Sequence, residues 1–409
     1  MRRRSLVAQE KVLIMDNFFP RRLVGKQNIE KDSSFSTCAL IGDNIYAFTN
    51  HKRLPIKLNL KTKDIVLIED LKGYDSQFVA DEMQQAGNNI FVLEVNGNRL
   101  MEYNIEKRTC RYYEIGCHKE AWGNYVAFAK WKEELYIFPK YKDKIIKINI
   151  ESGKIKEINF LEYAKIVLNS PKDKVIFWYG FQDKNLVWLF GKKSNLVLVY
   201  DLESNTWRKH ELSEKINSCI HAVMHNGYMY ILSSEGKVYR WDMKNNSIKV
   251  LADCGDIKDG ENIFFRIAVT EKNIFLFPSL GEDILCIDLK KKQIDKYMTY
   301  PPDFMYCGPD EWSKYYGYCE DEDFYYFAMR SMNFIPCVNK RIGNIKWLKL
   351  EVPAFKEYMW FYIKKNKRLL EEKECKIVDI VDYIENSNEK SQEKEYILVG
   401  EQIFRQLKS

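Results

Sequence analysis

Seven copies of a four-residue pattern recur along the middle of the chain, and this period constrains the fold more than any other feature. Each copy is apolar with an aromatic residue at its second position, and a second apolar run follows it. That run ends in Asn or Asp, 12 to 14 residues after the aromatic residue. The Asn and Asp residues recur every 41 to 52 residues, which is the size of a β-propeller blade. The aromatic residues are Tyr46, Phe91, Tyr136, Trp188, Tyr230, Phe275 and Tyr325.

The Asn or Asp that ends each second run predicts a tight turn, because its side chain can accept a hydrogen bond from the backbone two residues further on. These residues are Asn59, Asn104, Asn149, Asp201, Asp242, Asp288 and Asn339. Each unit has room for four strands, since one β-like segment precedes the aromatic pattern and another follows the turn. We therefore expect an all-β fold, a seven-bladed propeller of four-stranded antiparallel blades over residues 34–352. A β-sandwich of regular hairpins is the alternative, but it does not require this period.

The fourth unit contains the stretch VYDLESNTW, in which Tyr200, Asp201 and Trp207 resemble the turn of kelch-type propellers. The resemblance extends over 34–352 as a pattern, although the paired glycines of the family are replaced by Asn, Asp, Glu or Lys. It implies a propeller of the galactose-oxidase-like superfamily. It implies no single activity, because the family includes partner-binding scaffolds, a copper-dependent sugar oxidase and a sialic-acid mutarotase.

The segments on either side of the repeats lack the period. Residues 1–33 form an N-terminal segment that can add a strand at the rim of the propeller. Residues 353–409 carry two apolar stripes at helical spacing, which predicts a short C-terminal helical extension. Such stripes usually pack on their own domain, and the alternative is a tail that docks a protein partner.

Cysteine usage and charge narrow the class of protein. The ten cysteines form no Cys-x-x-Cys pair and are irregularly spaced, which favours reduced, buried thiols and a cytoplasmic location. No uninterrupted apolar run is long enough for a membrane span or a signal peptide. The net charge of +6 includes +4 from residues 1–33, so the repeats offer no basic face for nucleic acid.

Recognised catalytic and metal-binding motifs are absent from the sequence. His221 and His225 are four residues apart, but their segment reads as a strand, in which that separation spans about 13 Å and is too long for one ion. No Gly-rich phosphate loop and no nucleophile elbow occurs. We therefore predict no metal, no cofactor and no assigned catalytic residue.

The repeat also predicts which residues face the central channel. Counting nine residues back from each aromatic position gives the column Thr37, Glu82, Ala127, Tyr179, His221, Arg266 and Tyr316. A core column would not carry Glu, His and Arg without partners, so we place it at the channel mouth, near Trp122 and Trp178. The predicted ligand-binding residues are Glu82, Trp122, Tyr179, His221, Arg266 and Tyr316. The alternative is a ring of mutually satisfied polar groups around water, and a count wrong by one would turn the column to the other face.

These patterns favour a non-catalytic binding scaffold that holds a protein segment or a small polar ligand at the channel mouth. The alternative is a carbohydrate-active enzyme, such as a sugar epimerase, mutarotase or lyase, with Glu82 and His221 as acid and base. A third hypothesis is a structural subunit that docks into a larger assembly through its flank or its tail.

Overall fold

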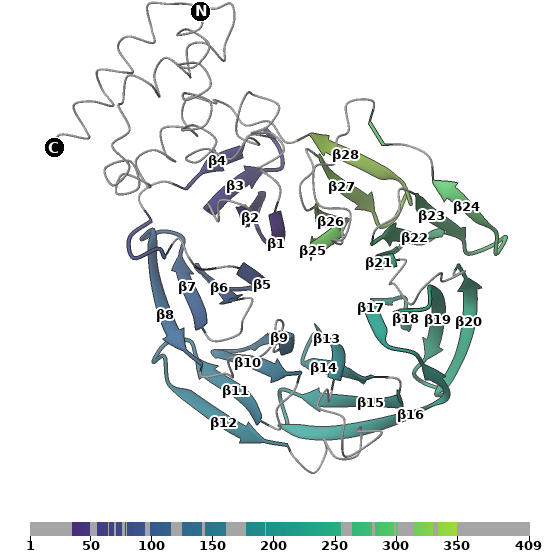
Figure 1. Cartoon of the computed structure of the whole chain (residues 1–409), viewed down its shortest axis with the longest axis horizontal. Helices are drawn as coiled ribbons and strands as arrows, with labels where there is room; N and C mark the ends of the chain where they lie inside the picture. The colour runs from purple at the N-terminus through teal and green to yellow at the C-terminus, as the bar shows by residue number, and fades with distance from the viewer. Residues whose placement is uncertain are drawn as a thin grey trace, which may run out of the picture.

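Twenty-eight strands form seven four-stranded antiparallel sheets around a central axis in the described part of the chain (Figure 1). The computed structural model describes residues 35–349 except 50–54, 64, 69–70, 76–77, 79, 95–98, 116–124, 141–143, 161–176, 193, 255–263, 280–282, 298–299, 302–314 and 330–333. The seven-bladed propeller that the period predicts is therefore confirmed. The N-terminal segment and the C-terminal helical extension lie outside the described residues.

Each blade is a run of four consecutive strands. Blade 1 contains β1 (Phe35–Ile41), β2 (Asn44–Thr49), β3 (Pro55–Asn59) and β4 (Ile65–Leu67). Blade 2 contains β5 (Ala80–Ala86), β6 (Asn89–Glu94), β7 (Arg99–Asn104) and β8 (Thr109–Glu114). Blade 3 contains β9 (Tyr125–Trp131), β10 (Glu134–Pro139), β11 (Lys144–Asn149) and β12 (Ile155–Asn159). Blade 4 contains β13 (Phe177–Asp183), β14 (Leu186–Gly191), β15 (Ser194–Asp201) and β16 (Thr206–Ile216).

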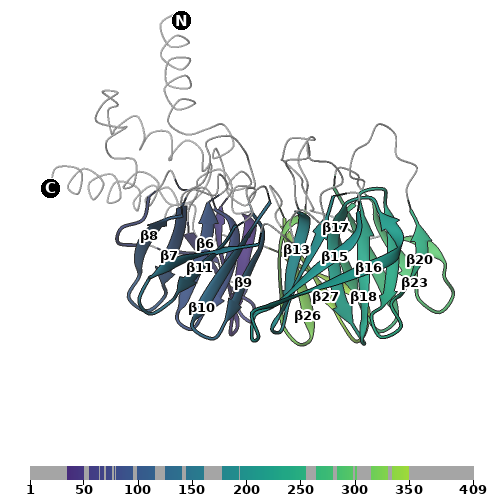
Figure 2. The same ribbon diagram turned by 90° about the horizontal axis from the view of Figure 1, so that it is seen from below.

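The remaining three blades repeat the same order. Blade 5 contains β17 (Cys219–His225), β18 (Tyr228–Ser233), β19 (Lys237–Asp242) and β20 (Ser247–Asp253). Blade 6 contains β21 (Phe264–Val269), β22 (Asn273–Pro278), β23 (Ile284–Asp288) and β24 (Ile294–Tyr297). Blade 7 contains β25 (Tyr315–Glu320), β26 (Phe324–Met329), β27 (Phe334–Asn339) and β28 (Ile345–Lys349). The first strand of every blade lies next to the axis and the fourth forms the outer rim (Figure 1), and Figure 2 shows the ring from its side.

The aromatic residue of each second strand packs between blades, which explains why it recurs. All seven of these aromatic residues are buried. Tyr136 of blade 3 contacts Tyr200 of blade 4, with ring centroids 6.2 Å apart. Trp188 of blade 4 meets Trp241 of blade 5 edge to face at 5.7 Å. Since a blade cannot bury both of its faces alone, these contacts join neighbouring sheets into one core.

The predicted turn chemistry is present in every blade. Each of the seven Asn or Asp side chains accepts hydrogen bonds from backbone N–H groups two or three residues further on, at 2.7–3.4 Å. The fourth residue after each of them has a positive φ of 50–73°. Glycine occupies this left-handed position only at Gly153 and Gly343. The side-chain hydrogen bonds therefore impose one turn geometry on seven different sequences.

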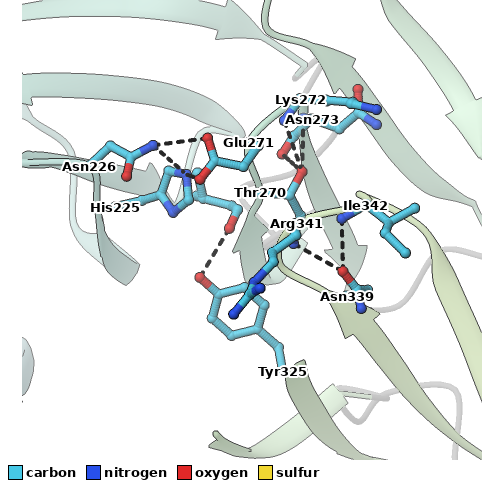
Figure 3. Close-up of polar contacts among 11 residues, drawn as sticks. His225, Asn226, Thr270, Glu271, Lys272, Asn273, Tyr325, Asn339, Arg341 and Ile342 are labelled. Atoms are coloured by element: carbon cyan, nitrogen blue, oxygen red, sulfur yellow. Dashed lines mark hydrogen bonds and ion pairs between the residues drawn. The ribbon is translucent and has the colours of Figure 1, made fainter. Parts of the chain in front are cut away.

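Polar side chains also join neighbouring blades on the turn face of the ring (Figure 3). Asn226 of blade 5 donates a hydrogen bond to Glu271 of blade 6 at 3.2 Å, as Figure 3 shows. The Tyr325 hydroxyl of blade 7 donates to the Val269 carbonyl of blade 6 at 3.0 Å. The described part of the chain contains no helix that is long and apolar enough to cross a membrane.

Candidate functional site

A β-bulge interrupts each innermost strand at the same level, just before the predicted column. The pairing with the second strand shifts between Phe177 and Tyr179 in blade 4, and between Cys219 and His221 in blade 5. The other five blades carry a shift at the corresponding place. A bulge adds one residue on one strand and redirects the neighbouring side chains. Trp178 and Phe265 are extra residues of this kind, and both line the channel.

A cavity of about 790 Å³ occupies the axis of the ring, and all seven blades contribute to its wall. Of the residues that sequence reasoning proposed for ligand binding, the structure places Glu82, Tyr179, His221 and Arg266 on this wall. They come from blades 2, 4, 5 and 6, which approach one another only in the closed ring. The volume lies in the range of small-molecule sites.

Two proposed residues are not described on the wall. Trp122 lies outside the described residues. The Tyr316 side chain is not described either, but the strand register places its backbone: Gly317 pairs with Ala328, and Tyr316 is the extra residue of the bulge, as Trp178 and Phe265 are in their blades. Asn339 pairs with Phe324 in blade 7 as Asn59 pairs with Asn44 in blade 1. The aromatic position of blade 7 is therefore held by Tyr326 and not by Tyr325. Counting nine residues back from Tyr326 reaches Gly317, which lines the cavity.

His221 is held as a neutral hydrogen-bond donor. Its side chain is buried, and the backbone N–H of Ile267 donates to its Nδ1 atom at 3.2 Å. Burial first, and then the nearby charge of Arg266, lower the pKa of His221 well below its ordinary value. With Nδ1 accepting a hydrogen bond, the single proton of the neutral ring must lie on Nε2.

Two tyrosines enclose this imidazole. The ring centroid of His221 lies 5.8 Å from that of Tyr179 and 5.4 Å from that of Tyr318, both in edge-to-face geometry. Sequence reasoning did not propose Tyr318 as a site residue. It belongs to blade 7, two blades away from His221, and no spacing in the sequence indicates a contact across the channel.

Arg266 and Glu82 act in opposite directions on the ionisation of Tyr179. Burial raises the pKa of Tyr179 above its ordinary value, while Arg266 acts to lower it and Glu82 acts to raise it. The guanidinium of Arg266 also lies 4.3 Å from the centroid of the Phe265 ring.

Two lysine side chains lie close to the indole of Trp178. The Nζ atom of Lys140 lies 4.5 Å from the ring centroid of Trp178, and that of Lys192 lies 5.0 Å from it. Trp178 and Lys140 both line the cavity, so aromatic surface and positive charge occur together on its wall. Among the described residues, no group of three or more His, Cys, Asp or Glu side chains could hold a metal ion.

No family model and no curated protein matches the sequence. The fold is similar to a streptogramin B lyase structure, with a TM-score of 0.53 and 13% identity, over 77% of this chain and 95% of that chain. It is similar to a catalytically inactive virginiamycin B lyase from Staphylococcus aureus with quinupristin, with a TM-score of 0.51 and 12% identity, over 74% and 93% of the two chains. The extracellular domain of a hybrid two-component system from B. thetaiotaomicron matches with a TM-score of 0.51 and 11% identity, over 76% and 41%. At these identities the likeness shows the propeller fold alone.

Proposed function

We propose that this protein is a non-catalytic binding scaffold that holds a small polar ligand in the central channel. The observation that carries the proposal is the cavity of about 790 Å³, whose wall combines aromatic rings with both signs of charge. Ligand sites are typically concave and largely apolar, with a few polar groups that orient the ligand. This wall matches that description.

The polar groups define the ligand. Arg266 supplies a fixed positive charge and Glu82 a carboxylate. His221 supplies an N–H donor at Nε2, because its Nδ1 atom accepts from Ile267. A ligand that carries a carboxylate or several hydroxyl groups, together with an apolar face for Trp178, satisfies these groups best.

The same geometry argues against the enzyme alternative in its simplest form. An acid–base pair of Glu82 and His221 requires a histidine nitrogen that can accept a proton from a substrate. In His221 the Nδ1 lone pair already accepts from the Ile267 backbone, and the other nitrogen bears the proton. A sugar epimerase, mutarotase or lyase at this site would need another base.

We also propose a repeat type, a compartment and a division of the chain into segments. In the fourth blade the rings of Tyr200 and Trp207 lie 4.8 Å apart beside the Asp201 turn, which supports a kelch-type repeat. The seven cysteines described in the structure are free thiols, which supports a reducing compartment such as the cytoplasm. We propose that residues 1–33 are an N-terminal segment, that residues 34–352 form the propeller and that residues 353–409 are a tail. We also propose that this tail docks a protein partner.

The test is a thermal-shift and calorimetry screen of the purified full chain. The panel contains neutral monosaccharides, sugar acids, amino acids and small dicarboxylates. We expect at least one compound to raise the melting temperature of the wild type and to lose at least tenfold in affinity in Arg266→Ala. The matched control is Arg341→Ala, which removes an exposed arginine of the β27–β28 turn and should bind like the wild type.

Two results would contradict the small-ligand proposal. One is equal binding by wild type and Arg266→Ala for every compound that binds. The other is no binding by any compound, combined with capture of a protein from native lysate that Arg266→Ala no longer captures. If truncation after Val352 abolishes capture of the protein and Arg266→Ala still captures it, the result would instead support the docking tail.

A further inference from the structure

The ring closes by side-chain packing alone in the described part of the chain. Blade 7 is completed by its own outer strand β28, and each sheet consists of four consecutive strands. Closure therefore depends on the contact between β1 of blade 1 and β25 of blade 7, where no strand is exchanged. Cys38, Cys319 and Cys337 are all buried in the apolar cluster that fills this closing interface.

Two of these thiols lie almost within bonding distance. The Sγ atoms of Cys38 and Cys319 are 3.3 Å apart and share a hydrogen bond, although 281 residues separate them in sequence. A disulfide requires about 2.05 Å between the sulfur atoms, so a shift of little more than an ångström completes the approach. Both residues also line the central cavity, which gives a small reagent a route to them.

We propose that Cys38 and Cys319 form an oxidisable dithiol, which a low-molecular-weight disulfide converts into a covalent bond between the first and last blades. The modification is distinct from ligand binding at Arg266 and does not depend on it. The bond would enclose residues 38–319, from β1 to β25, in one covalent loop and so prevent the ring from opening at its closing interface.

The reaction is two successive thiol–disulfide exchanges. The thiolate of Cys38 attacks one sulfur atom of the small disulfide and releases the other half as a thiolate. The thiolate of Cys319 then attacks the Sγ atom of Cys38 in the mixed disulfide and releases the second half. The protein loses two electrons and two protons, and the small disulfide is reduced to two thiols. The same exchange balances with the roles of Cys38 and Cys319 reversed, because either thiol can make the first attack and the other then resolves the mixed disulfide.

The experiment uses the full chain, purified with reductant and then incubated with oxidised glutathione in native buffer. Intact mass measures the loss of two hydrogen atoms, and peptide mapping without reduction identifies the linked peptides. We expect a Cys38–Cys319 link as the major product, absent from Cys38→Ala and Cys319→Ala. Cys219→Ala is the matched control, since it removes a buried thiol from the innermost strand of blade 5 and should leave the link intact.

Thermal unfolding tests whether the Cys38–Cys319 bond stabilises the closed ring. The oxidised wild type should melt about 3–6 °C above the reduced protein, and the difference should vanish in Cys38→Ala. The proposal is overturned if the folded wild type gives no Cys38–Cys319 peptide under excess oxidised glutathione. It is also overturned if the peptide forms without a rise in melting temperature. Both readouts use the wild type, so they hold even if a variant folds poorly.

Discussion

The imidazole of His221 lies edge-on to the ring of Tyr318, with centroids 5.4 Å apart, although the two residues belong to blades 5 and 7. Tyr179 of blade 4 contacts the same imidazole from another direction at 5.8 Å. One neutral histidine thus connects three blades at the wall of the channel. Its protonation state should matter to the stability of the whole ring.

The pH dependence of stability follows from this burial. The unfolded chain binds a proton at His221 near pH 6.5, whereas burial and then Arg266 lower the pKa of the folded side chain. The unfolded state therefore binds more protons as the pH falls below about 6.5, and the free energy of unfolding decreases there. Compared with His221→Asn, the wild type should lose up to about 1.4 kcal/mol more per pH unit between pH 6 and pH 5. Urea unfolding over a pH series measures this difference.

The Asn variant keeps an acceptor for the Ile267 N–H and removes the titration. His225→Asn is the control, because His225 is only partly buried at the end of β17 and the change in pH slope should be smaller. Identical pH slopes for the wild type and His221→Asn would show that His221 is not the group responsible.

The Asp201 side chain should contribute strongly to the stability of the fold. Its carboxylate accepts from the backbone N–H groups of Glu203 and Ser204, from Asn185 Nδ2, and from Arg208 at 2.8 Å. Asp201→Ala leaves these donors without their buried acceptor and should lower the free energy of unfolding by about 2–3 kcal/mol. Glu203→Ala, an exposed change in the same turn, should stay within about 0.5 kcal/mol of the wild type. Equal midpoints in urea for the two variants would contradict this account.

The close approach of blades 3 and 4 depends on Gly180. A Cβ atom at this position would lie 2.7 Å from Leu189 Cδ2 and 3.0 Å from Ala127 Cβ. Gly180→Ala should therefore lower the free energy of unfolding by about 1–3 kcal/mol through overpacking. Gly42→Asn serves as the control, because a Cβ there meets nothing within 4 Å and Asn tolerates its φ of 55°. If Gly180→Ala and Gly42→Asn have equal free energies of unfolding, blades 3 and 4 can move apart to accommodate the added methyl group and this account is wrong.

Gln182 pairs with the free backbone edge of β9. Its Oε1 atom accepts from the Lys130 N–H at 2.8 Å, and its Nε2 atom donates to the Lys130 carbonyl at 2.7 Å. Gln182→Glu removes the donor to the Lys130 carbonyl and places a carboxylate against that carbonyl oxygen. The repulsion should open the contact, speed hydrogen exchange at the Lys130 amide and lower the free energy of unfolding by about 1–3 kcal/mol. Gln85→Glu is the control, since Gln85 bonds only locally to Gly87. Unchanged exchange at Lys130 in Gln182→Glu would exclude this role.

Most of the architecture could be predicted because its signals are local. The second-strand aromatic residue and the Asn or Asp of the turn lie within 14 residues of each other in every unit, and each unit forms its own sheet. The same period indicated that Glu82, Tyr179, His221 and Arg266 share one level of the channel. In blade 7 the count is off by one residue, because Tyr326 holds the aromatic position there and the column residue is Gly317.

The sequence by itself determined the number of blades, the four-stranded unit and the turn that ends each third strand, because periodic burial and side-chain capping act over short distances along the chain. Only the tertiary structure decided which residues meet across the ring. The contact of His221 with Tyr318 and the 3.3 Å approach of Cys38 to Cys319 join blades that are remote in sequence. Those distances depend on how seven sheets close around one axis, and no spacing along a chain encodes the geometry of that closure.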